Sequence, residues 1–299
     1  MPQVAATGAR LCCDTFAPTT ELGAGRVPVE RLPYLVEQAL ECLEGVEQII
    51  LVGAAPPVAF FGYPGKPSRC APEGCQFSHL AHPHEDGAGA LAALADLLGA
   101  PARSPLRVPL KLPDVPTCSL DATSVSAIMA TSTPEGAILV DEAITSSPPL
   151  LRVMATARPH THLAVAGGSL GQGMPAAIGA ALAAPDHKVV CAVGDGSAAY
   201  DLQALWTMAR ENLDVTMVIY ANRAYAILNF ELQRAGAAAL GVGPKALSMF
   251  DLGRPRVDWV KIAEGMGVEA SRATTCGELA DQYRSAMKQR APRLIEAVI

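Results

Sequence analysis

The chain has 299 residues, of which 50% are hydrophobic and 17% are charged, and its formal net charge is −6. This composition allows a large buried core and excludes wholesale disorder. The acidic balance and the scattered Lys and Arg residues argue against nucleic acid as a partner. The sequence contains no apolar run of about 18 residues and no signal-peptide pattern, so we expect a cytoplasmic protein without a membrane partner.

The first 101 residues alternate between strand and helix patterns, which indicates a parallel sheet. The expected strands cover 10–14, 48–52 and 76–81, and the expected helices cover 35–43 and 88–98. Residues 56–72 are rich in Pro and Gly and predict a long loop. The aromatic residues of this loop either pack across the sheet edge or contact a ligand; they are Phe60, Phe61 and Tyr63.

The eight cysteines do not form a disulfide framework. Cys12 and Cys13 are adjacent, and Cys42 and Cys191 lie in apolar segments, so most of the thiols are expected to be reduced and buried. One group resembles zinc ligands only superficially, because its spacing fits no standard zinc finger and the strand at 76–81 would turn alternate residues to opposite sides. That group is Cys70, Cys75, His79, His82 and His84.

A proline-rich stretch, 102–118, predicts a linker, and the strand and helix pattern restarts at residue 119. Residues 119–299 predict an α/β domain with a doubly wound parallel sheet. The expected strands are 137–140, 162–166, 189–193, 215–220, 268–270 and 293–298. The expected helices are 119–131, 149–156, 172–184, 199–211, 259–266 and 277–289.

The strand at 189–193 is followed by an abrupt change to polar and glycine residues. Its apolar residues are typical of a strand buried on both faces of a parallel sheet. Gly194 and Gly196 flank Asp195, so we expect a sharp turn there that a ligand can approach without meeting a Cβ atom. Ser197 adds a hydroxyl and exposed N–H groups for phosphate oxygens, just before the expected helix at 199–211. Such a strand, turn and helix can bind phosphate.

Asn222 lies just past the next strand, 215–220. Because the ends of neighbouring parallel strands lie side by side, Asp195 and Asn222 can converge on one hard cation. A charged and a neutral oxygen ligand suit Mg²⁺ held jointly by protein and diphosphate. The alternative is that Gly-Asp-Gly forms only a surface turn.

Two motifs in the expected order resemble the thiamine diphosphate enzymes. The first comprises Gly194 to Ser197, the helix with Leu205-Trp206-Thr207 and the strand before Asn222. The second, residues 167–179, is similar to the acetolactate synthase and benzoylformate decarboxylase branch of that family. By this resemblance, 119–299 is the diphosphate-binding domain and 1–101 is a partial, Rossmann-like central domain.

The resemblance implies two cofactors, thiamine diphosphate and Mg²⁺, and a 2-keto acid substrate. It implies that Asp195, Asn222 and the backbone carbonyl of Ala224 bind Mg²⁺. The implied contacts of the cofactor's diphosphate are Gly194, Gly196 and Ser197, together with a polar loop that contains Glu142, Thr145 and Ser146. The alternative for Thr145 and Ser146 is that they cap the next helix.

The second motif is implied to hold the other end of the cofactor. Gly168 would accept a hydrogen bond from the aminopyrimidine, and Leu170 would wedge beneath the bent cofactor. The alternative is that Gly168 belongs to a flexible turn and Leu170 to the core. Tyr225 either packs over the cofactor or lies in the core. Two positions depart from the family pattern: Arg223 stands where Asn or Gly is common, and Ala226 where Gly is common.

The family's activating Glu comes from a pyrimidine-binding domain of the partner subunit, and no residue here matches it. We therefore expect an acetolactate synthase-like lyase or ligase, present here as a fragment or truncated form. It would act as a homo-oligomer, a dimer or tetramer, or with a separate pyrimidine-domain chain. The alternative is a noncatalytic cofactor-binding or assembly subunit. Flavin is not supported, since no Gly-x-Gly-x-x-Gly pattern is found in the central domain. The candidate substrate-pocket residues are Phe230, Gln233 and a possible lid or loop at 241–250.

Overall fold

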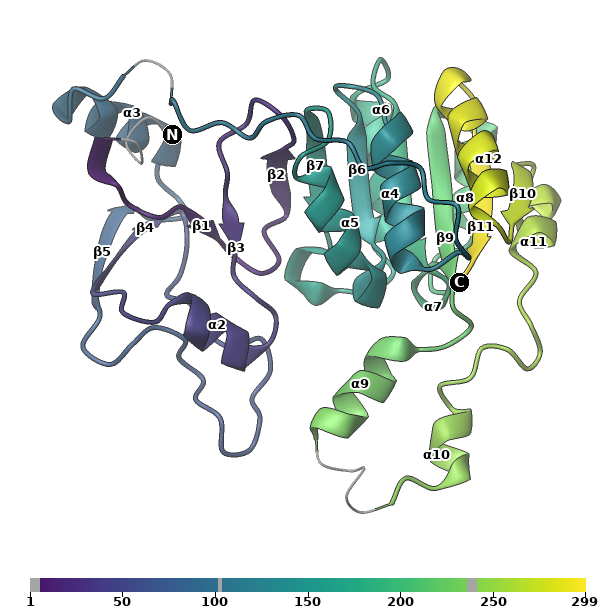
Figure 1. Ribbon diagram of the computed structural model, residues 1–299, viewed down its shortest axis with the longest axis horizontal. Coiled ribbons are helices and arrows are strands. Elements are labelled where there is room, and N and C mark those ends of the chain that lie inside the picture. The colour runs from purple at the N-terminus through teal and green to yellow at the C-terminus, as the bar shows by residue number, and fades with distance from the viewer. Residues whose placement is uncertain (1–5, 102–103, 236–240) are drawn as a thin grey trace. The chain divides into compact units, whose positions relative to one another are not determined.

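The computed structural model describes residues 6–101, 104–235 and 241–299 (Figure 1). The chain divides into two compact units. The first comprises Met1–Ala17 and Val27–Arg107, and the second comprises Pro18–Arg26 and Val108–Ile299. Each unit has its own core and is described separately.

The second unit is built on a seven-stranded sheet in the order β10-β11-β9-β8-β6-β7-β2. Its strands are β2 (Thr19–Leu22), β6 (Ile138–Glu142), β7 (His160–Ala164), β8 (Val189–Gly194), β9 (Val215–Ala221), β10 (Glu269–Ala273) and β11 (Arg293–Val298). All neighbours are parallel except β2, which runs antiparallel to β7 at the edge. The predicted α/β fold is confirmed, with one antiparallel strand added to the parallel sheet.

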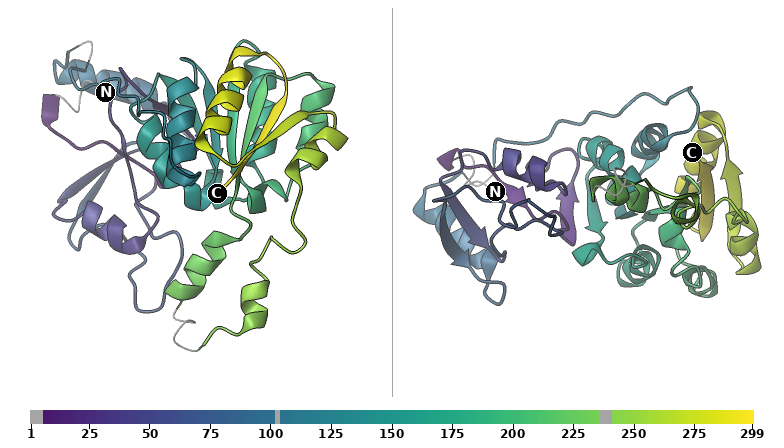
Figure 2. Two further views of the ribbon diagram at one scale, coloured as in Figure 1. Left: turned by 45° about the vertical axis from the view of Figure 1, so that its right-hand side comes forward. Right: turned by 90° about the horizontal axis from the view of Figure 1, so that it is seen from below.

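Helices cover both faces of this sheet (Figure 2). One face packs against α4 (Ala122–Ser132), α5 (Ser147–Met154) and α12 (Cys276–Lys288). The other packs against α6 (Gly173–Ala183), α8 (Ala204–Arg210) and α11 (Trp259–Gly265). Successive residues of β8 alternate between the two cores, with Val190 and Ala192 in the first and Cys191 and Val193 in the second. Burial on both faces explains why this strand contains no polar residue.

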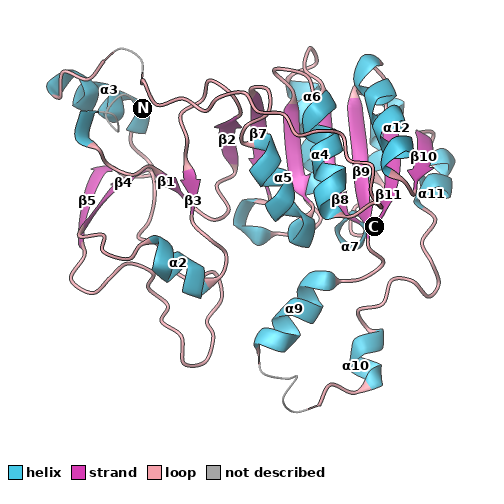
Figure 3. Ribbon diagram, viewed as in Figure 1, coloured by secondary structure: helices cyan, strands magenta, loops and turns pink. Residues whose placement is uncertain are grey.

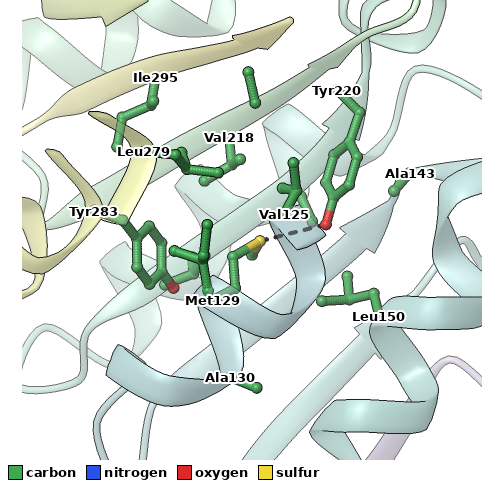
Figure 4. Close-up of a cluster of buried hydrophobic side chains, with 14 of the residues drawn as sticks. Val125, Met129, Ala130, Ala143, Leu150, Val218, Tyr220, Leu279, Tyr283 and Ile295 are labelled. Carbon is green, nitrogen blue, oxygen red and sulfur yellow. Dashed lines mark hydrogen bonds between the residues drawn. The ribbon is translucent and has the colours of Figure 1, made fainter. Parts of the chain in front are cut away.

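The core beneath α4 also contains Tyr220. Tyr220 near the end of β9 is fully buried, and its hydroxyl lies 3.4 Å from the Met129 sulfur and 3.2 Å from the Ser126 hydroxyl. Figure 4 shows the ring of Tyr220 pointing toward Met129. A buried phenol needs such partners, and α4 supplies them.

Short helical segments connect the strands (Figure 3). They are η1 (Ile144–Ser146), η2 (Ala166–Gly168), α7 (Asp195–Ala198), α9 (Ala226–Arg234) and α10 (Pro244–Ser248). The helix predicted at 199–211 is wrong at its start, because the chain leaves helical structure between α7 and α8. The segment at 241–250, predicted as a lid or loop, contains α10.

The first unit has two separate pairs of parallel strands. The pairs are β1 (Cys12–Cys13) with β3 (Glu30–Arg31), and β4 (Gln48–Val52) with β5 (Gln76–Ala81). The helices described in full there are α2 (Val36–Cys42) and α3 (Gly87–Leu97). The aromatic residues of the predicted loop pack on one another and on Phe16 and Tyr34, with the Phe60 ring centre 4.7 Å from those of Phe16 and Phe61.

The predicted boundaries of 1–101, 102–118 and 119–299 differ from this division at two places. Residues 18–26 belong to the second unit, because β2 pairs with β7 there. The proline-rich stretch joins the second unit from Val108 onward, where the Val108 N–H donates to the Arg26 carbonyl. Both differences arise from long-range pairing that local sequence patterns do not encode.

Candidate functional site

A hollow in the second unit lies at the ends of β6, β8 and β9. It brings together most of the predicted site residues: Thr145, Ser146, Leu170, Gly194, Asp195, Gly196, Ser197, Asn222, Ala224 and Tyr225. Its remaining lining comes from Ala143, Ile144, Tyr200, Tyr220, Ala226 and Ile227. Gly168 is not among the described lining residues; it lies two positions before Leu170 on the loop that reaches the hollow.

Asp195 follows the buried strand β8 directly and is only 6% exposed. Its Oδ1 accepts a hydrogen bond from the Gly196 N–H (2.9 Å), and its Oδ2 accepts one from the Arg223 N–H (2.7 Å). Burial raises the pKa of the Asp195 carboxyl, and these two N–H groups oppose that rise. Each carboxylate oxygen has a further lone pair, so the side chain can also bind a cation.

Asn222 follows β9, the strand beside β8. Its side-chain oxygen accepts a hydrogen bond from the Ala224 N–H (2.9 Å). Between them, Arg223 has a left-handed backbone with φ of 57°. This conformation is easiest for Gly and Asn, the two residues that the resemblance leads us to expect at this position. Arg223 keeps it, and its N–H thereby reaches Asp195.

The glycines of the first motif do not need a left-handed backbone. Gly194 has a φ of −70°, and Gly196 lies within α7 and is not among the glycines with positive φ. A Cβ atom on Gly196 would lie 2.7 Å from the Tyr225 ring. Gly196 is therefore required for close packing, and Tyr225 both packs on it and lines the hollow.

Glu142, at the end of β6, connects three segments near the hollow but is not among the described lining residues. Its carboxylate accepts hydrogen bonds from the N–H groups of Gly171 and Gly173 and from the Ser197 hydroxyl. Burial raises the pKa of the Glu142 carboxyl, and the three hydrogen bonds oppose the rise. The sequence indicated only a polar loop here, because nothing local shows that Glu142 reaches a loop about 30 residues away.

The second motif forms a loop that only glycine can adopt easily. Gly167, Gly168 and Gly171 have φ values of 63°, 67° and 93°. Leu170 is 42% exposed and lines the hollow, so the alternative that it is only a core residue is wrong. The loop thus presents an apolar side chain to the site.

The segment after β6 also lines the hollow. Ser146 occupies the N-cap position of α5, yet its side chain makes no capping hydrogen bond, and Thr145 is exposed. The capping alternative is therefore wrong for Ser146. Ile144 has a left-handed φ of 53°, which is unusual for a β-branched residue. Such strain is concentrated at functional sites.

Residues 146–297 match the model of the thiamine pyrophosphate enzyme C-terminal TPP binding domain. The chain belongs to the thiamine pyrophosphate enzyme family. Among the described residues of this family member, no helix is long and apolar enough to cross a membrane.

Three relatives illustrate the similarity. The chain is 49% identical to the "Putative acetolactate synthase large subunit IlvX" of Mycobacterium tuberculosis, over 99% of this chain and 57% of that protein. It is 30% identical to a benzoylformate decarboxylase of Pseudomonas aeruginosa, over 89% of this chain and 51% of that one. It also resembles the solved structure of the thiamine diphosphate-dependent 4-hydroxybenzoylformate decarboxylase of Rhodococcus jostii RHA1, with a TM-score of 0.79 and 27% identity over 99% of this chain and 57% of that one. The chain thus spans about half the length of these relatives.

Proposed function

We propose that this chain anchors thiamine diphosphate and Mg²⁺ in the hollow at the ends of β6, β8 and β9. The whole enzyme would cleave or form carbon–carbon bonds of 2-keto acids, in the manner of acetolactate synthase. The observation that carries the proposal is the meeting of Asp195 and Asn222, from adjacent strand ends, on one hollow that Leu170 also lines. The predicted cytoplasmic location stays a prediction.

The donor atoms fit Mg²⁺. Asp195, Asn222 and the Ala224 carbonyl offer hard oxygen ligands, whereas Mg²⁺ takes six. Within 6–101, 104–235 and 241–299, no group of three His, Cys, Asp or Glu side chains could hold a metal alone. The remaining ligands would come from the cofactor's diphosphate and water.

The other residues would hold the cofactor in place. Thr145 and Ser146 line the hollow together with Gly194, Gly196 and Ser197, and all five would border the diphosphate. Leu170 would support the bend of the cofactor, with Gly168 beside the aminopyrimidine and Tyr225 over the diphosphate end. When bound, thiamine diphosphate supplies the electron sink for decarboxylation.

A second component is part of the proposal. Asp195 is the one carboxylate among the described lining residues, and as a metal ligand it is not available for proton transfer. The activating Glu would come from a pyrimidine-binding domain, in another subunit of a homo-oligomer or in a separate chain. In the second candidate function, this chain is a noncatalytic cofactor-binding or assembly subunit that needs a separate pyrimidine-domain chain.

Binding calorimetry tests the proposal. We expect the chain to bind thiamine diphosphate only when Mg²⁺ is present, and Asp195→Ala and Asn222→Ala to weaken binding at least about tenfold, because each removes a metal ligand. Asp186→Ala, at an exposed carboxylate away from the hollow, serves as the matched control. Absence of binding by the wild type, or equal binding by Asp195→Ala, contradicts the proposal.

A further inference from the structure

Two cysteines far apart in the sequence lie opposite each other in the second unit. Cys118 precedes α4, and Cys276 is the first residue of α12. An isolated antiparallel bridge pairs Ser119 with Thr275, so Cys118 and Cys276 are the residues that directly adjoin that bridge, one in each segment. The bridge holds the two backbone segments at strand-pairing distance, which places the two cysteines in the same neighbourhood. A disulfide needs Cβ atoms about 3.5–4.5 Å apart, so the bond would require a local adjustment of these two residues.

The side chains confirm this proximity. Burial raises the pKa of the Cys276 thiol, and the neighbouring Cys118 thiol adds to that rise, whereas the Ser124 side chain opposes it. Cys276 is 1% exposed, whereas Cys118 is exposed, and both are free. A solute oxidant can therefore reach Cys118, and Cys276 is already held beside it.

We propose that Cys118 and Cys276 form a reversible disulfide in the presence of a peroxide. The peroxide would oxidise the Cys118 thiol to a sulfenic acid and release one water. The Cys276 sulfur would then attack the Cys118 sulfur, so that the S–S bond forms, the S–O bond breaks and the Cys276 proton leaves with the second water. The two sulfurs lose two electrons, which the peroxide gains. A dithiol reductant would return two electrons and two protons.

The bond would tie together the starts of two helices that pack side by side on one face of the sheet (Figure 1). The closed loop from 118 to 276 contains every candidate site residue. Helix α4 also carries Ser126, whose hydroxyl contacts that of Tyr220 at the hollow. Oxidation would thus stabilise the unit that holds the candidate site.

Peptide mapping without reduction tests the inference. After native incubation with hydrogen peroxide, we expect one cross-linked peptide pair joining Cys118 to Cys276. The melting temperature of the second unit should rise by about 5–10 °C, since the bond closes a long loop in the unfolded chain. Dithiothreitol should reverse both effects.

Two variants and one control complete the experiment. Cys118→Ser and Cys276→Ser should each abolish the cross-link and the thermal shift, whereas Cys75→Ser, in the first unit, should keep both. Because Cys118 is exposed, its replacement leaves the core intact even if Cys276→Ser folds poorly. The inference is overturned if peroxide leaves Cys118 unlinked or converts it to sulfinic acid, or if Cys118→Ser retains the thermal shift.

Discussion

Glu142 holds three segments of the chain at one buried point. The N–H groups of Gly171 and Gly173 and the Ser197 hydroxyl all donate to its carboxylate. Loss of such an acceptor leaves buried donors without a partner, which costs more than the hydrogen bonds contribute when formed. Glu142 therefore determines where the Leu170 loop lies relative to α7.

We predict that Glu142→Ala lowers the free energy of unfolding by about 2–4 kcal/mol, as measured by urea denaturation. Glu142→Gln should cost less, because its amide keeps one acceptor oxygen. Glu135→Ala, at an exposed carboxylate just before β6, should change stability by less than about 0.5 kcal/mol. If Glu142→Ala and the wild type had the same midpoint of urea denaturation, the position of the Leu170 loop would not depend on the Glu142 carboxylate.

Gly196 and Tyr225 also depend on each other, because the Tyr225 ring occupies the space that a side chain at position 196 would fill. We predict that Gly196→Ala costs about 1–3 kcal/mol, because its Cβ would displace the Tyr225 ring. Tyr225→Ala in the same chain should remove most of that cost, which a double-mutant cycle measures. The control is Gly179→Ala in α6, where a Cβ meets nothing within 4 Å and helix propensity favours Ala. Strict additivity of the two substitutions would contradict the packing argument.

At the scale of elements, α4 begins with a reciprocal cap. The Ser124 N–H donates to Asp121 Oδ1 (2.7 Å), and the Asp121 N–H donates to the Ser124 hydroxyl (2.8 Å). The hydrogen bond from the Ser124 N–H lowers the pKa of the Asp121 carboxyl. A lowered folded-state pKa means that the ionised cap stabilises the fold above the unfolded pKa of about 3.9 and that this stabilisation is lost as the pH falls through the folded value.

We predict that Asp121→Ala costs about 1 kcal/mol at pH 7 and progressively less below about pH 4. Asp121→Asn keeps a capping oxygen without the titrating charge, so its stability relative to Asp121→Ala should not depend on pH in this range. Urea denaturation of the three proteins at pH 7 and pH 3 measures both differences. If the difference in unfolding free energy between the wild type and Asp121→Ala were the same at pH 7 and pH 3, the charge of Asp121 would not contribute to stability.

Most elements follow from local patterns, and the exceptions have tertiary causes. The apolar run of β8 and the helical spacing of α12 are visible in the sequence, and both elements lie within a residue or two of their predicted bounds. Strand β2 has only four residues and exists because β7 offers an edge. The predicted helix at 199–211 is interrupted where Tyr200 and Asp201 approach Gly171, a contact that periodicity does not record.

For the molecule as a whole, the two units have separate cores of very different size. Among the described residues of the first unit, the buried hydrophobic cluster has four members, Val36, Ala39, Leu43 and Cys70, and Leu51 and Ala81 are buried outside it. Two larger clusters fill both faces of the sheet in the second unit. Because hydrophobic burial is the main stabilising contribution, we expect the first unit to unfold at the lower temperature.

We predict two calorimetric transitions. Leu43→Ala should lower only the first, and Leu205→Ala, in α8, only the second, because each removes a buried side chain from one core. A single transition that both substitutions shift equally would show that the units unfold as one.

The sequence alone determined the alternation of strands and helices, the α/β class and the family motifs around Asp195 and Leu170, since these depend on residues close together in the chain. Only the tertiary structure decided that Gly196 makes room for Tyr225, that Glu142 fastens the Leu170 loop and that Cys276 lies against Cys118. These contacts join residues about 30 to 160 positions apart. The periodicity of apolar residues indicates which face of a helix or strand is buried. It does not indicate which distant residue packs against that face, because that depends on the tertiary structure.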